Sequence, residues 1–164
     1  MQQTILAILG IFCVFAVAQQ IHCTSPVRYV VSEFKANWFR ASEYCFYRGM
    51  QLAIVKTPEE HRQMVEVSKD SHAFSNDSFI AWFGGNDLAE EGIFIWHATG
   101  ERVRYANWRP GQPDNYGGDE DCMALMNIPA SGWQWHANDG PCQNAHYFIC
   151  QNINDPFRRG VTTF

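Results

Sequence analysis

Apolar and polar positions first repeat along the chain with the period of an α-helix. Between Asn37 and Gly49, the residues Trp38, Ala41 and Cys45 recur every three to four positions and therefore share one helical face. Asn37 is a favourable N-cap residue, and Gly49 can end a helix. We predict an amphipathic helix between them.

A second helix is predicted from Thr57 to about Lys69. Thr57 can cap it, a proline occupies the first helical position, and Glu60 completes a capping box. Met64 and Val67 are expected to face inward.

The other apolar runs are short and are bounded by turn residues, as in strands. They are YVVSEF, QLAIV, SFIAWFGGND, CMALM, WQWHAND and AHYFICQ. GIFIWHATGERVRYANW predicts a hairpin that turns near Thr99 and Gly100. Two helices followed by strands favour the α+β class. Residues 107–131 are mostly loop, and a loop of that length inside a compact domain is commonly functional.

The N-terminus has the composition of a secretory signal peptide. An apolar run from Ile5 ends in the small-x-small pattern Ala-Val-Ala, which predicts cleavage after Ala18, although no Lys or Arg lies near Met1. The run is too short to span a bilayer comfortably, so we expect a soluble, secreted, extracellular protein without membrane insertion. The expected organisation is a signal peptide at 1–18, a lead-in at 19–28, a domain at 29–151 and a tail at 152–164.

The charge and the cysteine content limit which molecules the protein is expected to bind. The formal charge is −5 at pH 7 and no basic stripe is present, so nucleic acid is not an expected partner. The cysteines beyond the signal peptide are Cys23, Cys45, Cys122, Cys142 and Cys150. Their number is odd, which leaves one for a partner chain or as a free thiol. Zinc is less favoured, because the spacings lack a Cys-x-x-Cys pair. A sequon predicts glycosylation at Asn76.

The segment GQPDNYGGDEDC gathers four acidic side chains in residues 111–122. Their repulsion opposes folding unless a cation, hydrogen bonds or open solvent offsets it. A solvated turn is the simpler explanation, but Ca²⁺ prefers six to eight oxygen ligands of this kind. The nearby oxygen-bearing side chains are Gln112, Asp114, Glu120, Asn138 and Asp139. A cis peptide bond before Pro113 would turn its two neighbours to one side.

A series of short motifs resembles the carbohydrate-recognition domain of the C-type lectin family. These motifs are NWFRASEYC, GMQLAIVKTPEE, AWFGGND, NWRPGQPDN, EDCMAL, ANDGPC and YFIC, and the resemblance covers roughly Tyr29 to Gln151. It implies a double-loop fold with two helices, two small antiparallel sheets and a long calcium-binding loop. It also implies the disulfides Cys45–Cys150 and Cys122–Cys142, which leave Cys23 unpaired.

The resemblance further implies how the loop would bind calcium and sugar. The principal calcium site would consist of Gln112, Asp114, Glu120, Asn138 and Asp139. Two adjacent sugar hydroxyls would complete the ion's shell and exchange hydrogen bonds with the same acids and amides. A second calcium site is suggested by Asp87, Glu91, Asn115, Glu120 and Asp121. Relatives carry an acid where Asn115 stands, so the charge of this second site is lower.

The Gln-Pro-Asp order of residues 112–114 resembles the galactose-type motif, whereas Glu-Pro-Asn marks the mannose-type branch. Tyr116 lies where an aromatic ring could stack on the apolar face of galactose. Two features depart from the family pattern. The glycine-rich insertion that sharpens galactose preference in some relatives is missing. Ala137 stands where relatives usually carry Trp, and Trp133 or Trp135 is a candidate to fill the space.

The sequence therefore resembles the small soluble lectins of invertebrates. We expect a calcium-dependent lectin for terminal galactose or N-acetylgalactosamine, with innate immune recognition or agglutination as the implied role and homo-oligomers through Cys23. We do not expect an enzyme, because every acid of the cluster has a metal role and no nucleophile motif is present. The alternatives are broader, mannose-type glycan binding, a related domain that binds a protein partner, and an ice-binding scaffold.

Overall fold

The computed structural model describes residues 29–153 of the chain. The predicted signal peptide, the lead-in with Cys23, and residues 154–164 of the predicted tail lie outside the described residues. Within the described range, no helix has both the length and the apolar character that crossing a membrane requires.

The first predicted helix is α2, Trp38–Tyr47, and its cap forms as expected. The Asn37 side chain accepts a hydrogen bond from the N–H of Arg40 at 2.9 Å. Trp38 and Cys45 are buried on the inner face. Just beyond the helix, Gly49 has a φ of +69°, a conformation that glycine adopts without strain.

The second predicted helix is α3, Pro58–Lys69. The Thr57 hydroxyl accepts from the N–H of Glu60 at 3.2 Å, and the Glu60 carboxylate reaches back to the N–H of Lys56 at 2.6 Å. Met64 is buried as predicted. Val67 is only half-buried, whereas Val65 is buried, so the buried face of α3 is formed by Met64, Val65 and Ser68.

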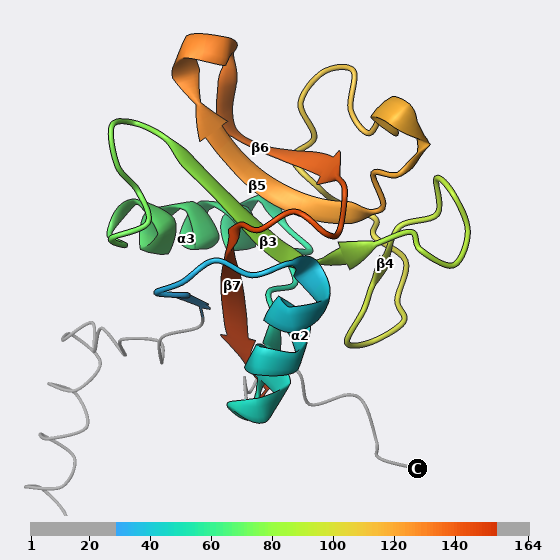
Figure 1. The fold of residues 1–164 in the computed structure, drawn as a ribbon, viewed down its shortest axis with the longest axis horizontal. Coiled ribbons are helices and arrows are strands. Elements are labelled where there is room, and N and C mark those ends of the chain that lie inside the picture. Colours follow the sequence, from blue (N-terminus) through green and yellow to red (C-terminus); the bar gives the residue numbers. More distant parts are fainter. Residues whose placement is uncertain (1–28, 154–164) are drawn as a thin grey trace, which may run out of the picture.

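Seven strands form one connected sheet in the order β1-β7-β3-β5-β6, with β2 beside β7 and β4 beside β3 (Figure 1). The strands are β1 (Tyr29–Val31), β2 (Met50–Leu52), β3 (Phe79–Asn86), β4 (Ile95–Trp96), β5 (Cys122–Ile128), β6 (Trp133–Gly140) and β7 (Tyr147–Asn152). All pairings are antiparallel except β3 with β7. The expected α+β double-loop fold is confirmed, and the single parallel pairing joins its two antiparallel groups into a mixed sheet.

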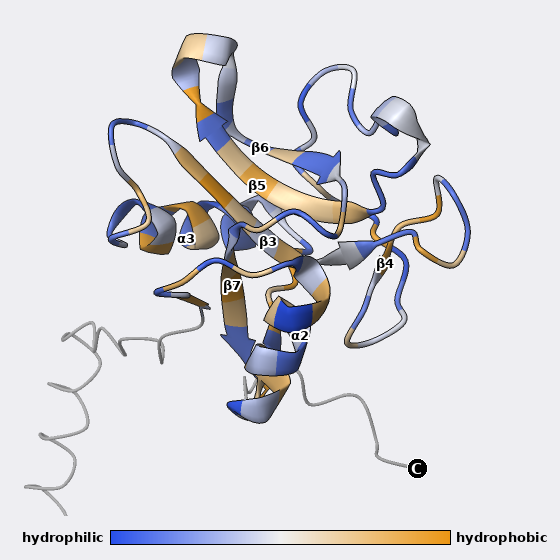
Figure 2. Ribbon diagram, viewed as in Figure 1, coloured by the Kyte–Doolittle hydropathy of each residue, from blue (hydrophilic) through white to orange (hydrophobic). Residues whose placement is uncertain are grey.

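The core lies between the sheet and the two helices. Two disulfides link segments that surround it. Figure 2 shows apolar residues along β3, β5 and β7, while the long loop that follows β4 is mostly hydrophilic. Cys45–Cys150 ties α2 to β7, and Cys122–Cys142 ties the start of β5 to the segment after β6. Both pairings agree with the prediction.

The predicted hairpin is present, but its second arm is short. The N–H groups of Thr99 and Gly100 donate to the carbonyl of Trp96 at 3.0 and 2.8 Å, which makes the turn. On the return, Arg102 forms only an isolated bridge with Ile95. The chain then enters the long loop, which carries the 3₁₀ turn η1 (Tyr116–Gly118).

Candidate metal centre

Three of the predicted metal ligands meet in space although they are distant in sequence. Asp114 precedes η1, Glu120 follows it, and Asp139 lies near the end of β6. Each offers a carboxylate oxygen, and these oxygens lie within 4.8 Å of one another. Three negative charges at this separation repel one another strongly unless a cation lies between them.

Hydrogen bonds hold the loop against the end of β6. The Asp139 carboxylate accepts from the N–H groups of Asp114 and Asn115 at 3.0 and 2.8 Å, through its Oδ2 atom. The peptide bond between Gln112 and Pro113 is cis, the geometry that would turn both neighbours of Pro113 to one side. The backbone of the loop therefore positions Asp114 beside Asp139 without using the second oxygen of that carboxylate.

Several oxygen atoms of the predicted ligands are buried and have no hydrogen-bond partner within the described part of the chain. They are Oε1 of Gln112, Oδ1 of Asn138 and Oδ1 of Asp139. A buried acceptor without a partner destabilises a fold by about 1–3 kcal/mol. These atoms are neutral amide or anionic carboxylate oxygens beside an acidic cluster, which is the donor set that a hard cation such as Ca²⁺ takes. The residues present fit the ion.

Glu120 is held at the mouth of the cluster. Its carboxylate accepts from the N–H of Tyr116 at 2.8 Å, and its own N–H donates to the Asn115 side chain at 3.1 Å. Burial raises the pKa of Glu120, and the negative charges of Asp139 and Asp114 raise it further. Among the described residues, no cationic side chain forms an ion pair with Glu120.

Asp87 is a second buried carboxylate that forms no ion pair with any residue in 29–153. It follows β3 and is 2% exposed, its Oδ2 accepts from the N–H of Gly92 at 2.8 Å, and its Oδ1 has no hydrogen-bond partner among the described residues. Burial raises its pKa from 3.8 to about 6, against the Gly92 hydrogen bond, and the charges of Glu91 and Asp121 add to the rise.

Two other predicted members of the second site, Glu91 and Asp121, lie close enough to Asp87 for their charges to raise its pKa. The N–H of Asp87 donates to the carbonyl of Asp121 at 3.1 Å. The side-chain nitrogen of Asn115 donates to the Glu91 carboxylate. Asn115 therefore presents its nitrogen to Glu91, where the family's acid would present an oxygen, and its own oxygen is already used by the N–H of Glu120.

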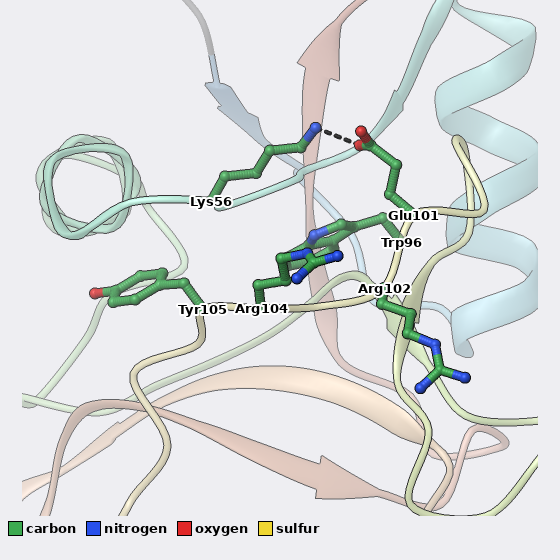
Figure 3. Close-up of a pocket in the computed structure, with 6 residues that line it drawn as sticks. All are labelled: Lys56, Trp96, Glu101, Arg102, Arg104 and Tyr105. Carbon is green, nitrogen blue, oxygen red and sulfur yellow. Dashed lines mark hydrogen bonds and ion pairs between the residues drawn. The ribbon is translucent and has the colours of Figure 1, made fainter.

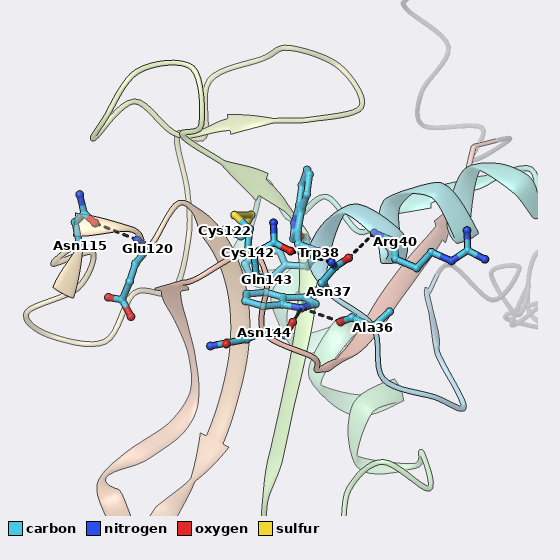
Figure 4. Close-up of a disulfide and its surroundings, with 12 residues drawn as sticks. Ala36, Asn37, Trp38, Arg40, Asn115, Glu120, Cys122, Cys142, Gln143 and Asn144 are labelled. Atoms are coloured by element: carbon cyan, nitrogen blue, oxygen red, sulfur yellow. Dashed lines mark hydrogen bonds between the residues drawn. A yellow bond between two sulfur atoms is a disulfide. The ribbon is translucent and has the colours of Figure 1, made fainter. Parts of the chain in front are cut away.

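Figure 4 shows Asn115 and Glu120 on the loop segment that leads into the Cys122–Cys142 disulfide. Cys122 follows the acids of the loop, and Cys142 follows the Asn138-Asp139 pair by three residues. The disulfide therefore fixes the two ligand-bearing segments to each other at their bases, with Cα atoms 5.2 Å apart.

Arg109 joins the loop to β6 and was missed by the sequence reasoning. Its guanidinium lies 4.4 Å from the centre of the Trp133 ring and donates to the carbonyl of Ser131 at 3.2 Å. Its backbone N–H donates to Ala137 at 3.2 Å, and its carbonyl accepts from the N–H of Gln112 at 2.9 Å. The only sequence signal was its position three residues before Gln112.

The departure at Ala137 does not leave an exposed gap, since Ala137 is buried in the core. Trp108 pairs with Ala137 through an isolated bridge. The two candidates to replace the missing Trp contact other groups: Trp133 lies under Arg109, and the Trp135 ring lies 5.5 Å from those of Phe74 and Phe79.

Two further predicted residues are exposed. Tyr116, the candidate for stacking on a sugar, lies on η1 and is 80% exposed. Asn76, the predicted glycosylation site, lies in an exposed turn just before β3, at the opposite end of that strand from Asp87.

Comparison with known proteins assigns a family to this arrangement. The sequence matches the family described as Lectin C-type domain over residues 34–152. It is 38% identical over 136 residues to salivary C-type lectin 1 of Aedes albopictus, which covers 83% of this chain and 89% of that protein.

Solved structures agree. The carbohydrate-recognition domain of the mouse scavenger receptor C-type lectin superposes with a TM-score of 0.62 at 27% identity, covering 76% of this chain and 89% of that chain. The cow C-type carbohydrate-recognition domain of CD23, solved in the presence of a GlcNAc2Man3 oligosaccharide, gives a TM-score of 0.60 at 28% identity and covers 74% of this chain and 84% of that chain.

Proposed function

This chain belongs to the C-type lectin domain family, and from that premise we propose that it is a secreted, calcium-dependent lectin that prefers terminal galactose or N-acetylgalactosamine. The observation that carries the proposal is the set of buried, unpartnered oxygens on Gln112, Asn138 and Asp139 beside the carboxylates of Asp114 and Glu120.

Calcium, when bound, would neutralise the acids and offer coordination positions to two sugar hydroxyls. Gln112, Asp114, Glu120, Asn138 and Asp139 would hold it. The side chains have complementary tasks toward the sugar. A carboxylate can only accept a hydrogen bond from a hydroxyl, whereas an amide nitrogen can donate to one. The same residues thus orient the hydroxyls that contact the ion.

The order of amide and acid supports the galactose preference. Gln112 and Asp114 flank Pro113 in the sense found in the galactose-type motif, and reversing them would exchange donor and acceptor positions around the diol. The exposed ring of Tyr116 supports the same preference, because an aromatic ring can cover the apolar face of galactose. We include the second calcium site around Asp87 in the proposal, supported by its unpartnered Oδ1 atom.

The chemistry of the cluster does not favour catalysis, since the acids are engaged as cation ligands. Incubation with galactosides should therefore give no hydrolysis. Turnover by the native protein that disappears in Glu120→Gln would contradict this part of the proposal.

Secretion and a role in microbial recognition or agglutination are also part of the proposal. The relative from Aedes albopictus is named as a salivary lectin, which supports export. N-terminal sequencing of protein secreted by insect cells should begin at Gln19. A non-reducing gel of the wild type and Cys23→Ser would test whether Cys23 links two chains.

The deciding experiment is binding of the mature protein to immobilised galactose and mannose, each with Ca²⁺ and with excess chelator. Chelator-sensitive retention on galactose is expected, with weaker retention on mannose. Equal or stronger binding to mannose would remove the galactose preference. A folded protein that binds neither sugar in Ca²⁺ would instead support the protein-binding alternative.

A further inference from the structure

A cavity of about 330 Å³ lies beside the β4 hairpin (Figure 3). Lys56 reaches it from the stretch between β2 and α3, and the remaining lining residues come from β4 and the segment that returns from it. The lining residues are Lys56, Trp96, Glu101, Arg102, Arg104 and Tyr105. None of them belongs to the candidate metal centre, and we call this site the hairpin cavity.

The hairpin cavity has an excess of positive charge on a chain whose formal charge is −5. Lys56 forms an ion pair with Glu101, as Figure 3 shows, and the Thr99 hydroxyl donates to the same carboxylate at 3.3 Å. These contacts balance the Lys56 charge. Arg102 and Arg104 are exposed and form no ion pair with any described residue. Two guanidinium charges therefore remain for a ligand.

The backbone that carries these arginines is fixed on both sides of the hairpin. Arg102 bridges to Ile95, and the N–H of Val103 donates to the carbonyl of Phe94 at 2.9 Å. Arg102 and Arg104 both line the hairpin cavity, and Figure 3 shows their side chains directed away from each other, so each can contact a different acidic group of one ligand. A guanidinium presents a planar fork of donors that matches two oxygens of a sulfate or carboxylate.

The rest of the lining indicates what carries the anion. Tyr105 is half-buried and contributes aromatic surface, which suits the C–H face of a sugar ring, whereas Trp96 is 1% exposed and belongs to the core. The cavity is at the lower end of the size range of small-molecule sites and matches a single sugar unit better than an extended ligand. A free inorganic anion would use the guanidinium groups but not the aromatic surface.

We propose that the hairpin cavity binds a sulfated glycan, with Arg102 and Arg104 contacting its sulfate groups and Tyr105 contacting the sugar. The choice of a glycan rests on the proposed lectin function, but the site needs no calcium. It gives the protein a second, charge-selective contact away from the metal centre.

The test measures binding of the mature protein to immobilised heparin in excess chelator, so that the metal centre does not contribute. The variant Arg102→Ala/Arg104→Ala should bind at least about tenfold more weakly than the wild type. The matched control Arg40→Ala/Arg48→Ala removes two exposed arginines from α2 and its end, and it should change the affinity by less than about twofold. Arg102→Lys/Arg104→Lys keeps the charge but loses the fork, and should lie between.

Equal losses in the two alanine pairs would overturn the proposal, because heparin would then respond only to net charge. Failure of the wild type to bind heparin, or equal binding of uncharged dextran and dextran sulfate, would also overturn it. So would equally tight binding of a DNA oligonucleotide of matched charge. Thermal unfolding should confirm that both pairs fold. Calcium-dependent galactose binding should survive in Arg102→Ala/Arg104→Ala, so this site and the proposed function can fail separately.

Discussion

The two ends of β6 differ in whether their side chains find partners within the protein. At the aromatic end, the Trp135 ring packs against Phe74 and Phe79. At the polar end, Asn138 and Asp139 each have a buried oxygen without a hydrogen-bond partner among the described residues. We therefore propose that β6 contributes to stability through its first residues and to ion binding through its last residues. A folded domain can carry such unsatisfied atoms only where the remaining structure holds them in place.

This difference predicts which perturbations act on folding and which on the ion. Changes at the aromatic end should lower the free energy of unfolding with or without calcium. Changes at the polar end should leave the metal-free fold intact and reduce calcium affinity.

The largest effect is expected from Trp135→Ala. Removing a packed tryptophan ring should lower the free energy of unfolding by about 3 kcal/mol, measured by urea denaturation in excess chelator. Calcium affinity of the folded variant should stay within about threefold of the wild type. Tyr116→Ala removes an exposed ring and should lose less than about 0.5 kcal/mol. A comparable loss in both variants would contradict the assignment of the aromatic end to stability.

Asp139→Asn should have the opposite profile. It removes one negative charge and one anionic oxygen from the cluster, so calcium affinity should fall about 100-fold, or about 2.7 kcal/mol. The metal-free protein should unfold at the same temperature or higher, because repulsion from Asp114 and Glu120 is relieved.

The matched control is Asp119→Asn, which removes the same charge from an exposed position in the same loop. Its calcium affinity, measured by calorimetry, should change by less than about threefold. If the two variants lost affinity equally, net loop charge and not the ligand cluster would determine binding.

Arg109→Ala tests the connection between the two ends, since Arg109 contacts Trp133 through its side chain and Gln112 through its carbonyl. Releasing the guanidinium should loosen the loop and weaken calcium binding about tenfold, a change comparable to those of residues that orient metal ligands. Stability in chelator should fall by about 1 kcal/mol. An unchanged calcium affinity would show that the backbone alone positions Gln112.

The smallest expected effects are on the pH dependence of the free energy of unfolding. They have opposite signs for Asp87, near the polar end of β6, and His61, near its aromatic end. Asp87 has a pKa raised to about 6, so in calcium-free protein its contribution to stability is present below its ordinary pKa of 3.8 and is lost as pH rises through about 6. Burial lowers the pKa of His61, near the aromatic end, so its contribution is present above 6.5 and is lost as pH falls through the lowered value.

Unfolding of calcium-free wild type, Asp87→Asn and His61→Asn across pH 4–8 separates these terms. The free energy of unfolding of the wild type should rise relative to that of Asp87→Asn as the pH falls through 6. Relative to that of His61→Asn, it should rise as the pH increases toward 6.5 and stay level above that value. If the free energy of unfolding changed with pH in the same way in all three proteins, neither Asp87 nor His61 would be the source of the pH dependence.

Local chemistry made the helices predictable. Asn37 and Thr57 cap as their side chains allow, and Met64 is buried as the helical period requires. The family resemblance supplied the disulfide pairing and the ligand set. The short return arm of the β4 hairpin could not be anticipated, because its residues alternate like a strand but have only Ile95 as a strand partner.

The candidate site was predictable only as far as each residue acts through its own chemistry. Asp114, Glu120 and Asp139 can be recognised as oxygen ligands from their residue types alone. The structure brings their carboxylates together. The contact of Arg109 with Trp133 depends on how the loop returns to β6, so no local pattern reports it. The same holds for Asn115, whose nitrogen faces Glu91 only in the folded loop.

We propose that the unpartnered oxygens at the polar end of β6 help to hold Ca²⁺, and that the bound ion in turn holds the sugar. The most direct test is a calorimetric titration of Ca²⁺ into the mature protein, with and without saturating galactose. If ion and sugar share one site, each must tighten the binding of the other, so galactose should raise the calcium affinity several-fold. An identical calcium affinity in the two titrations, or no calcium binding at all, would contradict the claim.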